Sequence, residues 1–187
     1  MRLFVSVDVP DELTDAVADL QNEFADADGL NLTDPSQAHL TLKFLGDVEA
    51  DRLPDLRREL AGAVVDADIG PFTARFEGLG VFPSLEYISV VWLGVEDGSE
   101  ELTRLHETVE ERTTAMGFEP ESHEFTPHVT LARMEHASGK ERVQGLVREH
   151  NPVVGETTVE SIHLTESTLT EDGPVYTTVE RFSFSNE

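Results

Sequence analysis

The chain has 187 residues, with 13 Lys or Arg against 38 Asp or Glu, so its formal net charge is −25 at neutral pH. This length, with 39% hydrophobic residues, is enough to bury the core of one folded domain. The sequence contains no Cys and no run of 18 apolar residues, which excludes disulfides, Cys nucleophiles and a membrane-spanning helix.

Hydrophobic periodicity predicts strands and helices that alternate along the chain. Alternating apolar residues predict strands at 3–9, 38–45, 72–81, 86–94, 127–134, 157–166 and 175–184. Apolar residues at helical spacing predict helices at 13–24, 53–64, 102–116 and 139–150. Turn residues separate these segments, for example Gly117 after the third helix and the run 171–174 between the last two strands.

The order of these elements contains one unit twice. It is β-α-β-α-β, followed by β-α-β-α-β-β. We therefore expect a single domain over residues 1–187 of the α+β class, with two pseudo-symmetric lobes of antiparallel sheet and helices that enclose a central cleft. The lobes are expected to divide near residues 83–85, and the protein to be a monomer.

Two equivalent predicted strands carry the same motif, His-apolar-Thr-Leu. One copy begins at His39 and the other at His128. On a strand, residues i and i+2 lie on one face, roughly 7 Å apart. His39 therefore projects together with Thr41, and His128 together with Thr130, while the apolar residues between them anchor the opposite face in the core.

Two further His-x-Thr matches lack this context. His106 lies in a predicted helix, where residues i and i+2 point in different directions. His163 lies on a predicted strand, but Glu166 follows its Thr where the two motifs have an apolar residue. The pair at His39 and His128 is thus the one that a duplicated unit would place around a shared cleft.

The sequence resembles the RNA 2′,3′-cyclic phosphodiesterase family, also called the 2′-5′ RNA ligase family, of the two-histidine phosphoesterase superfamily. The matching stretches span the chain in order: 1–10 (MRLFVSVDVP), 39–46 (HLTLKFLG), 81–83 (VFP), 90–94 (VVWLG), 126–133 (TPHVTLAR), 164–169 (LTESTL) and 173–176 (GPVY). The resemblance implies two α+β lobes around a cleft, with one His-x-Thr motif from each lobe. It implies an enzyme that hydrolyses RNA ends bearing a 2′,3′-cyclic phosphate to a 2′-phosphate.

Phosphodiester hydrolysis needs a base for the attacking water and an acid for the leaving oxygen. Two His near neutral pH serve both needs if one is neutral and one protonated, and hydroxyls such as those of Thr41 and Thr130 can stabilise charge on the phosphoryl oxygens. The resemblance implies His39 as proton donor and His128 as proton acceptor; the sequence by itself does not assign the two roles.

No cofactor is expected for this chemistry. Neither motif has a second His or a carboxylate at metal-ligand spacing, so we expect no metal. A Gly-x-x-x-x-Gly-Lys loop is also missing, so we expect no nucleoside triphosphate.

Three further residues are candidates for substrate binding. Lys43 has the same strand parity as His39 and Thr41, so we expect it to line the cleft. Arg133 has the opposite parity to His128, but the family often has Arg there, and we expect a bulge or strand end to turn it inward. Phe125, just before the second motif, is a candidate for stacking on a nucleobase.

Other functions remain open at this level. The same two His would serve the reverse reaction, ATP-independent 2′-5′ RNA ligation, and a related enzyme could hydrolyse a small substrate such as an ADP-ribose cyclic phosphate. A non-catalytic module that binds RNA ends would keep the cleft without titrating His. An acidic interaction protein would keep the His-x-Thr pairs for structural reasons only.

The acid excess also favours a particular cellular setting. Only two of the 13 basic residues are Lys, and the acids are spread along the chain. Self-repulsion at this net charge is relieved by salt, which favours the cytoplasm of a salt-adapted cell. The N-terminal strand reaches Asp8 too early for a signal peptide. Since counterion release requires excess cation, any RNA chemistry needs a local pocket.

Overall fold

Within residues 1–184, which the computed structural model describes, nine strands form one antiparallel sheet. The order along the sheet is β7-β4-β5-β6-β3-β1-β8-β9, with β2 paired to β6 off this path. The strands are β1 Arg2–Asp8, β2 Leu30–Leu32, β3 His39–Asp47, β4 Phe72–Pro83, β5 Ile88–Val95, β6 His128–Met134, β7 Val153–Val159, β8 Ser161–Thr170 and β9 Gly173–Ser183. The α-helices are α1 Thr14–Asn22, α2 Leu53–Ala67, α3 Ser99–Ala115 and α4 Lys140–Glu149.

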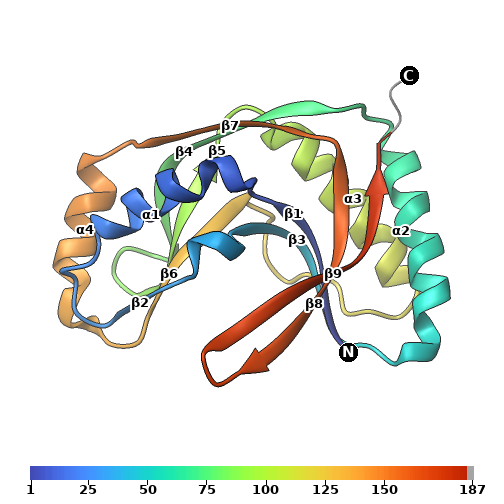
Figure 1. The fold of residues 1–187 in the computed structure, drawn as a ribbon, viewed down its shortest axis with the longest axis horizontal. Coiled ribbons are helices and arrows are strands. Elements are labelled where there is room, and N and C mark those ends of the chain that lie inside the picture. The colour runs from blue at the N-terminus through green and yellow to red at the C-terminus, as the bar shows by residue number, and fades with distance from the viewer. Residues whose placement is uncertain (185–187) are drawn as a thin grey trace.

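The sheet has two halves that meet where β3 lies beside β6. The first half is β3-β1-β8-β9 and the second is β6-β5-β4-β7. Helices α2 and α3 pack together and contact β9 and β3, whereas α1 and α4 contact strands of the second half (Figure 1). The predicted α+β class with antiparallel sheet and two related halves is therefore confirmed.

The two halves do not correspond to the two halves of the sequence. Residues 83–85 lie at the turn between β4 and β5, which pair with each other, so the chain does not pass between lobes there. Helix α1, from the start of the chain, covers the second half, and α3 covers the first. The lobes are interwoven because each takes a helix from the other part of the chain.

The strand predicted at 157–166 is in fact two strands. Val159 is the last residue of β7 and pairs with Phe72 of β4, while Ser161 begins β8, which pairs with β1. Only Glu160 separates them, so the curled sheet brings its two halves close together at this residue. The alternation of side chains continues across Glu160, which is why the pattern predicts one strand. The short strand β2 was not predicted.

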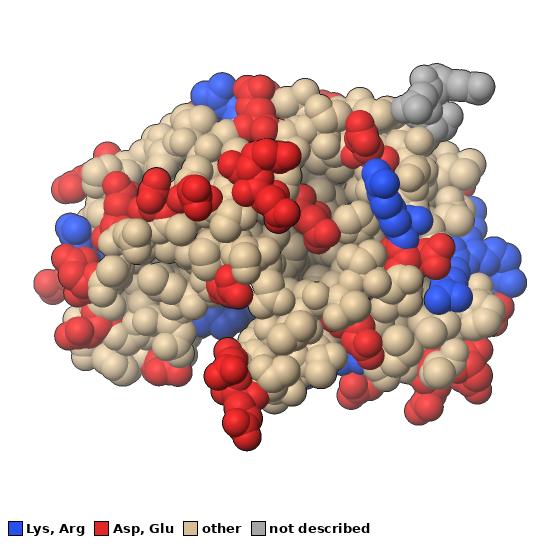
Figure 2. All heavy atoms as spheres, in the orientation of Figure 1, with Lys and Arg blue, Asp and Glu red and all other residues tan. Residues whose placement is uncertain are grey.

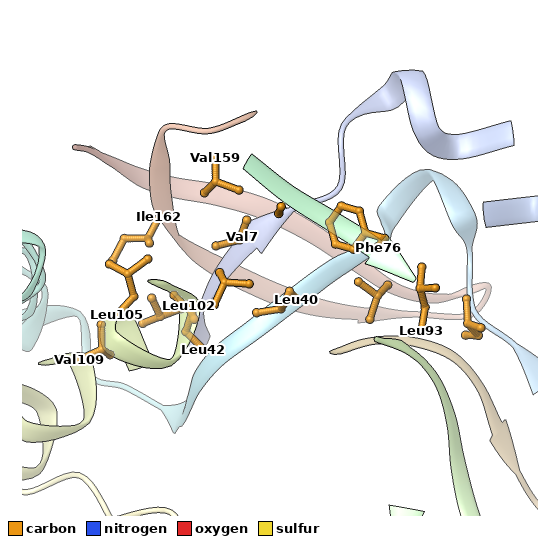
Figure 3. Packing of buried hydrophobic residues seen from close by; sticks show 14 of the residues in the cluster. Val7, Leu40, Leu42, Phe76, Leu93, Leu102, Leu105, Val109, Val159 and Ile162 are labelled. Atoms are coloured by element: carbon orange, nitrogen blue, oxygen red, sulfur yellow. The ribbon is translucent and has the colours of Figure 1, made fainter. Parts of the chain in front are cut away.

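A hydrophobic core on one face of the sheet holds the two motif strands in place. Leu40, Leu42, Val129 and Leu131 are each at most 2% exposed. Figure 3 shows Leu42 beside Leu102 and Leu105 of α3, with Leu40 further along β3. Burial of each such side chain stabilises the fold by about 1.5–3 kcal/mol. The core thus packs against one face of β3 and β6, and the opposite face of these strands is available for the polar motif residues.

The surface reflects the composition. Figure 2 shows carboxylates scattered over the visible face, with few Lys or Arg among them. None of the helices in residues 1–184 has the length and hydropathy needed to cross a bilayer.

Candidate active site

The four polar motif residues lie on one face of two neighbouring strands. Leu40 of β3 pairs with Val129 of β6 in antiparallel register, and both are buried. In an antiparallel pair, the residues on either side of this pair face the opposite way. His39 and Thr41 therefore project from β3 beside Thr130 and His128 of β6, as the repeated motif predicts.

Each imidazole is oriented by the backbone of the residue two before it. Nδ1 of His39 lies 3.1 Å from the carbonyl oxygen of Gln37, and Nδ1 of His128 lies 2.7 Å from that of Thr126. A carbonyl can only accept, so Nδ1 carries the proton in both rings. In the neutral form, Nε2 of each ring is then an acceptor that is available for proton transfer.

Aromatic rings surround His39. The centroid of Phe4, from β1, lies 4.9 Å from that of His39, and the centroid of Tyr176, from β9, lies 4.8 Å away with the two ring planes 80° apart. Phe4 and Tyr176 also contact each other. These rings exclude water from one side of His39 and limit its rotation.

His128 has an equivalent aromatic environment. Phe82, from β4, meets it edge-on at 4.9 Å, and Trp92, from β5, lies 5.9 Å away. Gly80 is required beneath Trp92, because a Cβ there would lie 2.1 Å from the indole ring. Both catalytic candidates thus stand between two aromatic side chains.

A β-bulge occurs at the same position of both motifs. Opposite β1, the register passes from Thr41 to Lys43 and omits Leu42; opposite β5, it passes from Thr130 to Ala132 and omits Leu131. One extra residue reverses the side-chain parity of everything after it. The residues after the bulges therefore face opposite to what simple alternation predicts.

The bulge overturns the prediction that Lys43 lines the cleft. Lys43 pairs with Val5, on the core face, and its side chain is only 1% exposed. Its Nζ lies 2.9 Å from Oε2 of Glu110 in α3 and donates to the carbonyl of Glu119. Lys43 is therefore held in a buried ion pair behind β3 and cannot reach a ligand on the His39 face.

The same feature places Arg133 as predicted. After the bulge at Leu131, Arg133 lies on the face of Thr130 and His128. Its side chain is exposed and, within residues 1–184, forms no ion pair. The equivalent residue of the first motif is Phe44, which lies on the face of Phe4, its stacking partner.

Buried polar side chains from the helices hold the two bulges. His106 of α3 donates from Nδ1 to the carbonyl of Leu42 at 2.7 Å. Gln21 of α1 donates to the carbonyl of Leu131 at 3.0 Å, and the Thr33 hydroxyl bonds the same region. Sequence reasoning missed these contacts, because nothing in a helix pattern indicates which strand carbonyl a polar side chain meets.

Phe125 has a partner within the fold. Its ring is stacked on His106 with centroids 4.2 Å apart and planes 5° from parallel. One face of this ring is therefore already covered, and its role in binding a base remains a prediction.

The two imidazoles differ in what stands opposite them. Asp8 of β1 pairs with His39, whereas Gly94 of β5 pairs with His128. Burial lowers the pKa of His39, and the charge of Arg133 adds to this, whereas the carbonyl of Gln37 and the Asp8 carboxylate oppose it. Burial also lowers the pKa of His128, opposed by the carbonyl of Thr126, and the charges of Arg133 and His39 lower it further with no carboxylate against them. His39 is therefore the imidazole with a counter-charge for its protonated form.

A hollow of about 340 Å³ adjoins His39. The residues that line it include the aromatic side chains of Phe4 and Tyr176 and the polar residues Asp8, Asp11 and Gln37. Among residues 1–184, no three His, Asp or Glu side chains are grouped closely enough to hold a metal ion.

Comparisons with known proteins agree over nearly the whole chain. Residues 7–171 match the family model described as the 2′-5′ RNA ligase superfamily. The RNA 2′,3′-cyclic phosphodiesterase of Methanothermobacter thermautotrophicus is 36% identical over 186 residues, which cover 97% of this chain and 98% of that protein. The one from Archaeoglobus fulgidus is 34% identical and covers 94% and 96%, respectively.

Solved structures share the fold. The crystal structure of TT0787 of Thermus thermophilus superposes with a TM-score of 0.80 at 32% identity, over 98% of both chains. Escherichia coli LigT in complex with 3′-AMP superposes with a TM-score of 0.81 over 99% of this chain and 98% of LigT. At 24% identity, LigT supports the fold alone.

Proposed function

This chain belongs to the 2′-5′ RNA ligase superfamily, and we propose that it hydrolyses 2′,3′-cyclic phosphate ends of RNA to 2′-phosphates by acid–base catalysis without a metal. The observation that carries the proposal is the pair His39 and His128, which project from adjacent strands with Nε2 free. The relatives named RNA 2′,3′-cyclic phosphodiesterase support the choice of substrate.

The proposed reaction is a single in-line displacement. Nε2 of His128 takes a proton from water as the water oxygen bonds to phosphorus. The bond between phosphorus and O3′ breaks, its electron pair stays on O3′, and Nε2 of His39 protonates that oxygen. The product is a 2′-phosphate with a free 3′-hydroxyl, and the proton on His128 returns to solvent as His39 is reprotonated.

The assignment of roles rests on the asymmetry between Asp8 and Gly94. An acid must hold its proton until the leaving oxygen develops charge, and Asp8 beside His39 favours that protonated form. A base must be neutral, and the cationic neighbours of His128 favour its neutral form. Arg133 lowers the pKa of both imidazoles, so the Asp8 carboxylate is the charge that distinguishes two otherwise equivalent residues.

The remaining site residues are proposed to stabilise the phosphoryl group. The hydroxyls of Thr41 and Thr130 lie on the same face as the imidazoles and can donate to non-bridging oxygens. The guanidinium of Arg133, which lies on this face, can donate two hydrogen bonds to the phosphate oxygens.

The test is hydrolysis of an oligonucleotide 2′,3′-cyclic phosphate in molar salt with EDTA. Wild type, His39→Ala, His128→Ala and the exposed control His123→Ala are compared, with products identified against 2′- and 3′-phosphate standards. We expect a 2′-phosphate, a loss of at least about 10²-fold in both active-site variants and none in the control. Loss of wild-type activity in EDTA would contradict metal independence, and wild-type binding without turnover would favour an RNA-end binding module.

A second substrate separates the two roles. In a cyclic phosphate whose 3′-oxygen is replaced by sulfur, the leaving thiolate needs no proton, because a thiol is a much stronger acid than an alcohol. His39→Ala should then recover most of its activity, whereas His128→Ala should not. Recovery of His128→Ala in place of His39→Ala would reverse the assignment.

A further inference from the structure

A chain of hydrogen bonds ends at Asp8 on the side away from His39. Nε of Arg181 donates to Oγ of Ser161 at 2.9 Å, Oγ of Ser161 lies 3.3 Å from Nε2 of His163, and Nδ1 of His163 lies 2.8 Å from Oδ2 of Asp8. The four residues come from β9, β8 and β1, which are consecutive strands of the sheet.

The hydrogen bonds at the two ends of this chain have a fixed direction. Arg181 can only donate and the carboxylate of Asp8 can only accept. Oγ of Ser161 accepts from Arg181, and Nδ1–H of His163 donates to Asp8, while the hydrogen bond between Ser161 and Nε2 of His163 can run in either direction. With either direction, Nδ1–H of His163 holds one oxygen of the Asp8 carboxylate.

Asp8 is otherwise free to leave this position. Its side chain is 49% exposed, and its carboxylate has no other hydrogen bond or ion pair within residues 1–184. Asp8 lines two hollows: the one beside His39, and a second of about 310 Å³ that is also lined by Ser161, His163 and Arg181. A carboxylate in such a place would turn into solvent unless a donor held it.

We infer that His163 is a positioning residue of the active site: it holds the Asp8 carboxylate on the sheet face beside His39 and so maintains the negative charge that His39 meets. This inference rests on the proposed function for its effect on catalysis. Asp8 is the direct neighbour of His39, and His163, supported by Ser161, acts only through Asp8.

The charges around the pair support this direction. The charged groups near His39 are Asp8 of β1, Arg133 of β6 and His128 of β6. The Tyr176 ring of β9 also contacts His39, and Asp11 lines the same hollow. Around Asp8 on its other side are His163, Arg181 and Glu160. Burial lowers the pKa of His39, and the negative charge of Asp8 raises it. If Asp8 turned away, the pKa of His39 would fall.

The experiment measures kcat/KM against pH for wild type, Asp8→Asn, His163→Ala, His163→Asn and Ser161→Ala, with His123→Ala as control. An acid must be protonated, so a lower pKa of His39 moves the alkaline limb of the profile to lower pH. We expect Asp8→Asn and His163→Ala to lose about three- to tenfold on the alkaline side and little at the optimum, since one pKa unit corresponds to tenfold. Ser161→Ala should lose less. His163→Asn, whose amide N–H can replace Nδ1–H, should restore the wild-type profile.

NMR titration of His39 in the same variants gives a readout that does not depend on turnover. The pKa of His39 should fall in Asp8→Asn and in His163→Ala and recover in His163→Asn, while thermal unfolding confirms that each variant is folded. Unchanged titration of His39 in His163→Ala overturns the inference, as does a fall that His163→Asn does not reverse. If the acid limb moves in place of the alkaline one, the coupling is supported, but the proposed role of His39 fails. Failure of this inference and failure of the proposed function therefore give different results.

Discussion

Replacement of Lys43 with Met distinguishes a buried ion pair from a substrate contact. Nζ of Lys43 lies 2.9 Å from Glu110, and the two side chains are 1% and 21% exposed. Burial raises the pKa of Glu110, but hydrogen bonds from Lys43 and the Glu121 N–H, with the charge of Lys43, lower it more, so the net pKa lies below its ordinary value. The pair therefore stabilises the fold above the unfolded pKa of Glu110, and this stabilisation is lost as pH falls through the folded pKa.

The size of the effect follows from the carboxylate that is left behind. Removal of one partner of a buried pair costs about 3–5 kcal/mol. Glu110 is partly exposed, so we expect about 2–4 kcal/mol for Lys43→Met. The double variant Lys43→Met with Glu110→Gln leaves no unpaired charge and should recover part of this loss.

Urea unfolding at pH 7 in fixed molar salt measures these changes, and initial rates measure KM on the folded variants. We expect a lower unfolding midpoint for Lys43→Met, with the slope and KM close to wild type. A variant with normal stability and a KM raised tenfold or more would refute the reasoning and restore Lys43 to the cleft. Equal losses in the single and double variants would show that the unpaired carboxylate is not the cause.

Four shorter predictions test other parts of the site and surface. Arg133→Met should raise KM for the cyclic phosphate about 10- to 100-fold with unchanged urea stability, because a charge-assisted hydrogen bond is worth about 1.5–3 kcal/mol. Since burial lowers the pKa of both His39 and His128, the bell-shaped profile of kcat/KM should be centred below about pH 6.5 in initial-rate measurements. Gln21→Leu should lower the free energy of unfolding by about 1–3 kcal/mol, because it leaves the Leu131 carbonyl with fewer donors. Because the net charge is −25, the thermal midpoint should rise, and kcat/KM on RNA should not fall, from about 0.1 M to 2 M salt.

The parts of the site that sequence predicts are those that obey a simple period. His39 and Thr41 share a face, and their repeat at His128 and Thr130 follows from alternation on a strand. The prediction fails for Lys43 because one extra residue, Leu42, reverses the parity, and alternation does not show where a strand is bulged. For Arg133, the resemblance to a family that often has Arg at this position suggested a bulge, which alternation alone did not predict.

The periodicity of the sequence does not predict contacts between elements that are distant along the chain. His106 and Gln21 look like ordinary helix residues, yet each bonds a bulge carbonyl on a strand from the other part of the chain. The exchange of α1 and α3 between the two halves of the sheet makes these contacts possible. A pattern of local periodicity carries no information about that exchange, so the division expected near residues 83–85 did not correspond to the lobes.

The symmetry of the site also explains why residues outside the motifs decide its chemistry. Two equivalent imidazoles would have the same affinity for a proton, and an acid and a base must differ in that affinity. The motifs themselves are alike, with the same carbonyl at Nδ1, the same bulge and similar aromatic neighbours. The differences lie outside the motifs. On the neighbouring strand, Asp8 pairs with His39 where Gly94 pairs with His128, and beyond the bulge the first motif has Phe44 where the second has Arg133. The charge of Arg133 lowers the pKa of both imidazoles, so Asp8 is the group that favours the proton on His39. Under the proposed mechanism, acid and base are therefore assigned from a strand that flanks the repeated motif.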